Sequence, residues 1–155
     1  MSVLAVNKKA GFDYSILETF EAGLVLLGYE VKSVKAGHIS LKEAYIDFRT
    51  DKDGHPELYL LKAHVPLYKP AGKVDDYNPT RSRKLLLRGG EIAHLIGKKH
   101  QAGLTLIPLR IYTKNSFIKL EFGLAQGRKK YDKREVIKKR EVERSIRTLT
   151  KRRQR

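Results

Sequence analysis

The sequence contains no cysteine, which excludes disulfide bonds and thiolate metal ligands. Its five histidines have no close metal-ligand spacing, so we expect no metal site and no other cofactor. No apolar run approaches the length of a membrane span. The N-terminus lacks a basic start and a long apolar segment, so we expect no secretory signal and a cytoplasmic location.

Groupings of residues that carry out catalysis are also missing. No serine lies in a nucleophile elbow. Gly127-Arg128-Lys129 lacks the earlier glycine and the Ser or Thr of a phosphate-binding loop. Paired carboxylates such as Asp75 and Asp76 are typical of turns. We therefore expect a protein that is not an enzyme.

Negative charge is scarce relative to positive charge. The chain has 33 Lys and Arg against 17 Asp and Glu, a net charge of +16 and a pI near 10.1. Residues 128–155 alone hold 14 basic and four acidic residues, or +10. A polyanion is the expected partner, and nucleic acid is favoured over membrane because no strongly amphipathic apolar face accompanies the charge.

A length of 155 residues with 41% hydrophobic content fits one compact domain and an appendage. We expect a folded domain over residues 1–126 and a basic C-terminal tail over residues 127–155.

An apolar stripe near the N-terminus predicts a helix. Ile16, Phe20 and Leu24 recur every four residues, Ser15 is placed to cap the helix, and Gly28 is placed to end it.

The next segments read as strands. Residues 29–35 alternate in polarity, and residues 44–49 and 57–65 predict a hairpin around the turn at 51–56. Residues 66–82 are rich in Pro, Gly, Asp and Asn and predict a long surface loop.

The second half predicts a strand at 85–87, a helix at 91–99, and strands at 104–112 and 117–124, with Pro108 at an edge or a bulge. The fold class is therefore an all-β core with helices. About six short antiparallel strands and two or three helices favour a small closed or nearly closed barrel of the oligonucleotide-binding type.

The tail has a weak helical pattern. Asp132 with Glu135 can cap a helix start, and Val142, Ile146 and Leu149 share one narrow face. Like charges stand four residues apart, however, and isolated helices of this length are marginal in water. We expect a tail that is disordered when free and helical when bound to a polyanion.

Two groups of charged residues are candidates for RNA binding. Glu30 and Lys32 lie on one face of the predicted strand. They are either the wet side of a half-buried sheet or a carboxylate and a lysine that meet RNA. Arg81, Arg83 and Lys84 are three close cations for which we expect few internal partners.

Five longer segments together resemble a known family. They are residues 20–23 (FEAG), 28–33 (GYEVKS), 81–87 (RSRKLLL), 103–109 (GLTLIPL) and 123–135 (GLAQGRKKYDKRE). In this order they resemble the SmpB family of SsrA-binding proteins. The resemblance implies an oligonucleotide-binding-type barrel that grips the tRNA-like domain of tmRNA. It also implies delivery, together with elongation factor Tu, to stalled ribosomes for trans-translation.

The resemblance also implies roles for particular residues. Glu30, Leu86 and Lys119 match the RNA-binding surface, Asn7 and Arg83 are further matches, and Lys32 joins them as a candidate. Tyr131 would stack in the decoding centre, with Asp132, Lys133 and Arg134 beside it, as the tail enters the empty messenger channel. The remaining tail candidates are Arg128, Lys129, Lys130, Ile146 and Leu149.

A ribosomal protein, or a general structured-RNA-binding protein with a basic extension, would have the same composition. Only the series of motifs favours the SmpB family over these alternatives.

Overall fold

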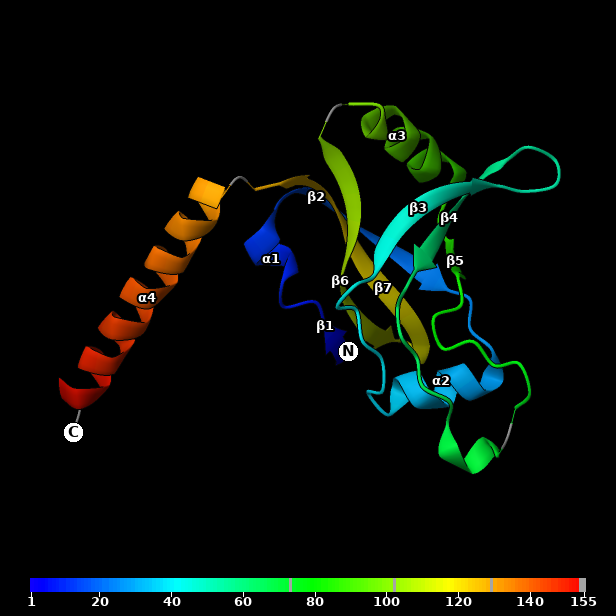
Figure 1. The fold of residues 1–155 in the computed structure, drawn as a ribbon, viewed down its shortest axis with the longest axis horizontal. Coiled ribbons are helices and arrows are strands. Elements are labelled where there is room, and N and C mark those ends of the chain that lie inside the picture. Colours follow the sequence, from blue (N-terminus) through cyan, green and yellow to red (C-terminus); the bar gives the residue numbers. More distant parts are fainter. Residues whose placement is uncertain (73, 102, 129, 154–155) are drawn as a thin grey trace.

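The computed structural model describes residues 1–72, 74–101, 103–128 and 130–153. One antiparallel sheet that closes on itself forms most of the molecule (Figure 1). The elements in chain order are β1 (Ser2–Val6), α1 (Ala10–Asp13), β2 (Tyr14–Leu24), α2 (Gly28–Lys35), β3 (Tyr45–Thr50), β4 (Pro56–Leu61), the 3₁₀ turn η1 (Lys69–Ala71), β5 (Arg83–Leu86), α3 (Gly89–Lys99), β6 (Leu104–Lys114), β7 (Phe117–Gly127) and α4 (Lys130–Arg153).

Six of the strands close into a barrel. Around the ring the order is β3, β4, β5, β2, β7 and β6, and β6 pairs again with β3. β1 lies outside the ring and pairs with β6. The predicted small antiparallel barrel of about six strands is confirmed, with β1 as an additional strand.

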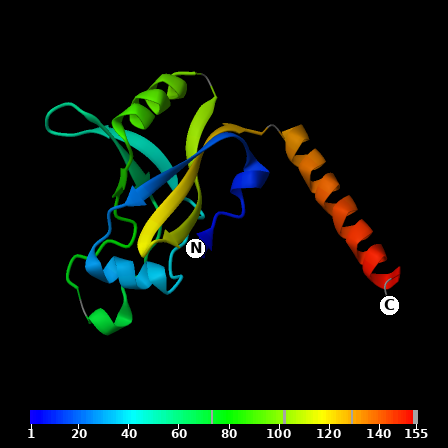
Figure 2. The ribbon, with the colours of Figure 1, turned by 180° about the vertical axis from the view of Figure 1, so that it is seen from behind.

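The core fills the barrel and is closed at its two ends by helices. In Figures 1 and 2, α2 and α3 lie at opposite ends of the barrel. Each helix contributes a fully buried apolar side chain to the core, Val34 from α2 and Leu95 from α3. The same core cluster includes the fully buried strand residues Leu58, Leu60, Leu120 and Phe122.

The segment predicted as the first helix is β2, so that prediction is wrong. β2 pairs with β7 over nearly all its length. Ile16, Phe20 and Leu24 stand four residues apart, and four residues are two full alternations of a strand as well as one helical turn. Ser15 therefore caps no helix, and Gly28 begins a helix where it was expected to end one.

The segment predicted as the next strand is the helix α2, so that prediction is also wrong. Its buried residues are Glu30, Ser33 and Val34, at the spacing of one helical face. Glu30 occupies the third helical position, and its carboxylate accepts a hydrogen bond from the Leu27 amide at 2.9 Å. That bond satisfies one of the free amides at the helix start.

The other elements follow the prediction more closely. The β3–β4 hairpin, the helix α3 and the β6–β7 hairpin are all present. The pairing of β6 with β7 shifts register between Pro108 and Arg110, which confirms the bulge. β4 ends at Leu61, short of the predicted Val65.

The tail forms one helix, α4, which projects away from the barrel (Figures 1 and 2). The helix begins at Lys130, so Asp132 lies within the first turn and is not the predicted cap. The tail is helical in this structure, which contains no polyanion, whereas we expected it to become helical only when bound to one. The behaviour of the isolated tail stays a prediction. Among the described residues no helix is both long and apolar enough to span a membrane.

Candidate nucleic-acid interface

A groove of about 410 Å³ lies where β2, β5 and β7 meet the C-terminal end of α2. It brings together two predicted RNA-binding residues, Leu86 of β5 and Lys119 of β7. Leu86 is 53% exposed although it is a strand leucine. The other lining residues are Gly23, Leu24, Leu26, Val31, Lys35, Ser116, Phe117 and Ile118.

Strand register explains how these distant residues meet. Gly23 of β2 is the partner of Leu86 on one side and of Lys119 on the other. Directly opposed residues of neighbouring strands point to the same face of a sheet. Leu86, Gly23 and Lys119 therefore form one row across three strands.

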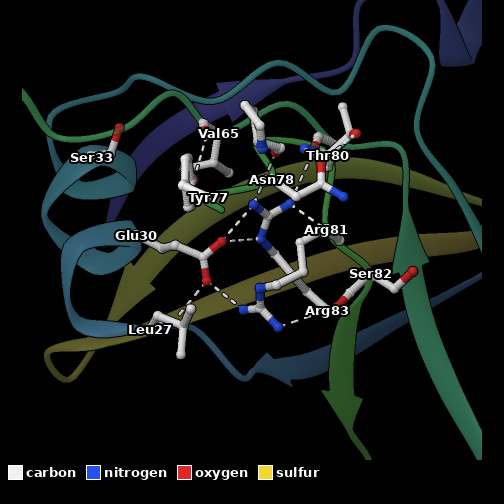
Figure 3. A network of polar contacts seen from close by, with 12 residues as sticks. Leu27, Glu30, Ser33, Val65, Tyr77, Asn78, Thr80, Arg81, Ser82 and Arg83 are labelled. Atoms are coloured by element: carbon white, nitrogen blue, oxygen red, sulfur yellow. Dashed lines mark hydrogen bonds and ion pairs between the residues drawn. The ribbon is translucent and has the colours of Figure 1, made fainter. Parts of the chain in front are cut away.

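Glu30 precedes the groove residue Val31 in sequence but does not line the groove, and it is fully buried. Figure 3 shows its polar contacts. Its carboxylate faces two guanidinium groups, those of Arg81 and Arg83. Arg81 Nη2 donates to Glu30 Oε1, and Arg83 Nε donates to Oε2 at 2.7 Å. Glu30 therefore neither lies on the solvent-exposed face of a sheet nor has a carboxylate that is free to accept hydrogen bonds from RNA.

The pKa of Glu30 reflects this environment. Burial would by itself raise the pKa of the carboxyl. Hydrogen bonds from Arg81, the Leu27 amide and Arg83 outweigh that effect and hold the pKa below its ordinary value. The group is therefore an anion at neutral pH.

Arg83 is buried as completely as Glu30 and is fully hydrogen-bonded. Besides Glu30, its guanidinium donates to the carbonyl oxygens of Ala63, Pro79 and Arg81 at 2.9 to 3.0 Å. These bonds tie the long loop of residues 62–82 to the barrel. Arg83 therefore has no exposed surface to offer RNA in this structure.

The expectation that the cations at 81–84 have few internal partners is wrong. Arg81 and Arg83 pair with Glu30, and Lys84 pairs with Glu57 at 2.7 Å. Arg81 contacts both the buried Glu30 and the solvent, because its side chain keeps 34% of its surface exposed.

Lys32 and Asn7 lie outside the groove. Lys32 is exposed on α2, with its ammonium 5.7 Å from the centre of the Tyr68 ring. The Asn7 side-chain amide donates to the Pro108 carbonyl at 2.9 Å and fastens the end of β1 to β6. Asn7 lines a separate pocket of about 350 Å³, which is also lined by Lys8, Lys9 and Lys42.

The start of the tail is held against the barrel by α1 and β2. Arg128 donates from its amide to the Asp13 carbonyl at 2.9 Å and from Nε to the Tyr14 carbonyl at 3.1 Å. Lys133 forms an ion pair with the Asp13 carboxylate at 3.3 Å. The structure thus assigns Arg128 and Lys133 contacts within the chain.

The other tail candidates are spread along α4. Lys130, Tyr131 and Asp132 lie in its first turn, and Lys129 lies outside the described residues. Arg134 is exposed, as are Val142, Ile146 and Leu149, which recur at helical spacing with 58–60% exposure.

One group of possible metal ligands occurs among the described residues. Asp51, Asp53 and His55 lie in the β3–β4 turn, with ligand atoms within 4.8 Å of one another. Asp51 already accepts the amides of Asp53 and His55 at 2.9 and 2.8 Å. This bonding is that of a turn stabilised by an Asp side chain.

Sequence reasoning missed Gly23, Lys35 and Phe117 as members of the groove. A signal for Phe117 was available: it begins a strand whose next residue, Ile118, is buried, so strand alternation points Phe117 outward. Gly23 was hidden by the wrong helix prediction.

The molecule is a basic antiparallel barrel followed by a cationic helix, and lysines flank the apolar groove of the barrel. This combination is typical of small β-barrel proteins that bind nucleic acids. The family model described as SmpB protein matches residues 4–152. The chain belongs to this family.

Individual relatives agree with this assignment. The chain is 47% identical over 146 residues to the SsrA-binding protein of Gloeothece citriformis, covering 94% of this chain and 91% of that protein. It is 50% identical over 142 residues to the SsrA-binding protein of Neorickettsia sennetsu, covering 91% and 92%. A chain of the solved structure "tmRNA-SmpB: a journey to the center of the bacterial ribosome" matches with a TM-score of 0.65 and 39% identity, over 88% of this chain and 95% of that one.

Proposed function

We propose that this protein is an adaptor that binds the tRNA-like domain of tmRNA (SsrA RNA) and brings it to stalled ribosomes for tagging of incomplete proteins. The observation that carries the proposal is the nearly full-length likeness to proteins named SsrA-binding proteins. The net charge of +16 and the groove with Lys35 and Lys119 supply the attraction to RNA. The protein acts in the cytoplasm and catalyses no reaction.

The barrel selects the RNA in this proposal. Leu86 and Lys119 contact it directly, because both line the open groove. Glu30 and Arg83 act indirectly, since both are buried and hold Arg81, α2 and the loop of residues 62–82 in place. Exposed Lys32 meets a phosphate. Asn7 holds the end of β1 against β6, so that Lys8 and Lys9, which follow β1, are in position for a further contact.

The tail reads the state of the ribosome. α4 enters the vacant messenger channel, where Tyr131 stacks in the decoding centre beside Asp132, Lys133 and Arg134. Arg128, Lys129 and Lys130 meet ribosomal RNA, and Ile146 and Leu149 pack along the channel. Elongation factor Tu accompanies the complex during delivery. The charge of +10 over residues 128–155 supports the tail's part of this proposal.

A competition gel-shift tests the proposal. The full chain, labelled tmRNA and a large excess of tRNA or ribosomal RNA are mixed at a stated salt concentration. We expect tmRNA to stay bound, and we expect Leu86→Ala and Lys119→Ala to weaken binding about tenfold. Substitution of single exposed tail lysines, Lys138→Ala or Lys151→Ala, is the matched control and should change affinity less than about threefold.

The same assay separates the alternative functions. Equal competition by all structured RNAs would point to a general structured-RNA-binding protein or a ribosomal protein. Equal losses for groove and tail variants would mean that charge alone, without a defined site, determines binding.

A further inference from the structure

The short helix α1 lies against the first turns of α4 (Figures 1 and 2). Lys133 Nζ pairs with the Asp13 carboxylate at 3.3 Å. Arg140 also reaches α1, because a Cβ added at Gly11 would lie 3.8 Å from Arg140 Nη2. Lys133 and Arg140 are about two helical turns apart and therefore project from the same face of α4. This face of the tail docks on α1.

Asp13 fastens the tail at two points. Its carbonyl accepts the Arg128 amide at 2.9 Å just before α4 begins, and its carboxylate pairs with Lys133 inside the helix. A helix that is fastened only at its start can swing and rotate, and the second point restricts both motions. On the side of β2 the helix stands away from the barrel, because an open pocket of about 300 Å³ lies between the two. The residues that line this pocket are Ser15, Arg128, Glu135, Val136 and Lys139.

The docked face decides which face of the tail is presented to a partner. Val142, Ile146 and Leu149 follow Arg140 by two, six and nine residues. At 3.6 residues per turn these offsets are rotations of about 200°, 240° and 180°. The three side chains are 58–60% exposed and lie on the side of α4 opposite Arg140. While Lys133 and Arg140 are docked, this apolar stripe is turned away from α1.

The ion pair between Asp13 and Lys133 is suited to guiding the tail. The side chains of Lys133 and Asp13 are 36% and 34% exposed. An ion pair this exposed adds little to the stability of a folded domain and shifts an equilibrium only about threefold. Its loss should therefore leave the barrel folded and change mainly the direction and rotation of α4.

We propose that Asp13 is a positioning residue for the tail. With Gly11 it forms a seat on α1 that sets the direction and the rotation of α4 as the helix leaves the barrel. Asp13 touches no RNA in this role and acts through Lys133, whose part in the tail is to hold the seat. The inference rests on the proposed function only in taking the messenger channel as the destination of the tail.

Thiol cross-linking tests the seat without any RNA. The chain has no Cys, so Gly11→Cys with Arg140→Cys places one thiol on each side of the joint. A short bismaleimide should join the two within one chain. Gly11→Cys with Lys138→Cys is the control, because residue 138 lies on the opposite side of the helix from residue 140, and it should react about fivefold more slowly. Asp13→Asn should slow the reaction of the first pair about threefold.

A double-mutant cycle tests whether Lys133 acts through Asp13. Tagging is measured with the full chain and tmRNA on ribosomes stalled without a codon. Asp13→Asn and Lys133→Gln should each lower the tagging rate about threefold, and both together should lower it no further, because the same ion pair is lost in all three variants.

Two further variants control the cycle. Asp13→Glu keeps the carboxylate and should restore most of the tagging rate that Asp13→Asn loses. Asp75→Asn makes the same chemical change at an exposed aspartate of the long loop and should leave the rate unchanged.

The two readouts fail separately. If the wild type does not select tmRNA but Asp13→Asn still slows the cross-linking of residues 11 and 140, the proposed function fails and the seat stands. The seat is overturned if the two Cys pairs react equally fast. It is also overturned if the wild type supports tagging and Asp13→Asn tags normally, or if the losses of Asp13→Asn and Lys133→Gln multiply in the double variant.

Discussion

Glu30 has no exposed surface, yet it is charged and holds together three parts of the chain. Its carboxylate caps the start of α2 through the Leu27 amide and pairs with Arg81 and Arg83. Arg83 in turn bonds carbonyl groups of the long loop. A substitution of Glu30 would therefore affect RNA binding by displacing its neighbours.

We predict that Glu30→Gln lowers the free energy of unfolding at pH 7 by about 3 kcal/mol, because it leaves the buried Arg83 without a counter-charge. Urea denaturation measures the effect. Glu57→Gln is the matched control. It removes the carboxylate partner of Lys84, which is 41% exposed, and should lower the free energy of unfolding far less than Glu30→Gln does. Equal effects in the two variants would contradict a special role for Glu30.

The same substitution should change the pH dependence of stability. Because folding lowers the pKa of Glu30, its contribution is complete above the ordinary carboxyl pKa, about 4.3, and is lost as pH falls through the lower folded-state pKa. The difference between wild type and Glu30→Gln should therefore shrink below about pH 5. Glu21 and Glu57 also have lowered pKa values, chiefly through hydrogen bonds from Tyr112 and Lys84, so both proteins should still lose some stability in acid. A constant difference down to pH 3 would exclude this linkage.

At the scale of elements, the sequence predicted the barrel, but it predicted β2 as a helix and α2 as a strand. The spacing of Ile16, Phe20 and Leu24 satisfies both periods, and only the pairing of β2 with β7, a contact across the chain, decides between them. In α2 the buried face consists of Glu30, Ser33 and Val34. Two of these three are polar, so a hydrophobic pattern could not reveal it.

The candidate site was likewise predictable only in part. Leu86 and Lys119 were predicted from the family resemblance, and the structure places them in one groove. Gly23 and Phe117 complete that groove only through strand register, which the sequence does not specify. The burial of Arg83 was also hidden, because its partner Glu30 is distant in sequence.

The joint between β7 and α4 gives a prediction at this scale. We expect Asp13→Asn to free the first turns of α4 by removing the ion pair with Lys133. The chain has no native Cys, so Lys52→Cys and Arg147→Cys can carry two spin labels, and electron paramagnetic resonance can measure their distance distribution. Asp13→Asn should broaden the distribution and leave tmRNA affinity within about twofold.

Glu143→Gln is the control for this joint, since it removes an exposed carboxylate of α4. An unchanged distribution in Asp13→Asn would show that the backbone and side-chain bonds of Arg128 to Asp13 and Tyr14 are sufficient to direct the helix.

At the scale of the whole molecule, we propose that the barrel binds the RNA and the tail senses the ribosome. The ring of strands is closed by β7, which ends at Gly127, and the buried core lies entirely before that residue. Most of the length of α4 is exposed, and none of its residues whose burial is described belongs to either core cluster. The tail can therefore be removed without opening the barrel.

A chain truncated after Gly127 should keep a cooperative unfolding transition and bind tmRNA within about threefold of the full chain at moderate salt. Its affinity should fall less steeply with salt, because up to ten net positive charges are lost. It should fail to support tagging in a reconstituted translation assay on ribosomes stalled without a codon, since no segment remains to enter the channel. A tail of the same composition in scrambled order, attached to Gly127, is the control for charge. We expect it to restore the salt dependence but not the tagging. If the truncated chain loses tmRNA binding together with tagging, or if the scrambled tail restores both, the division between a selecting barrel and a sensing tail is wrong.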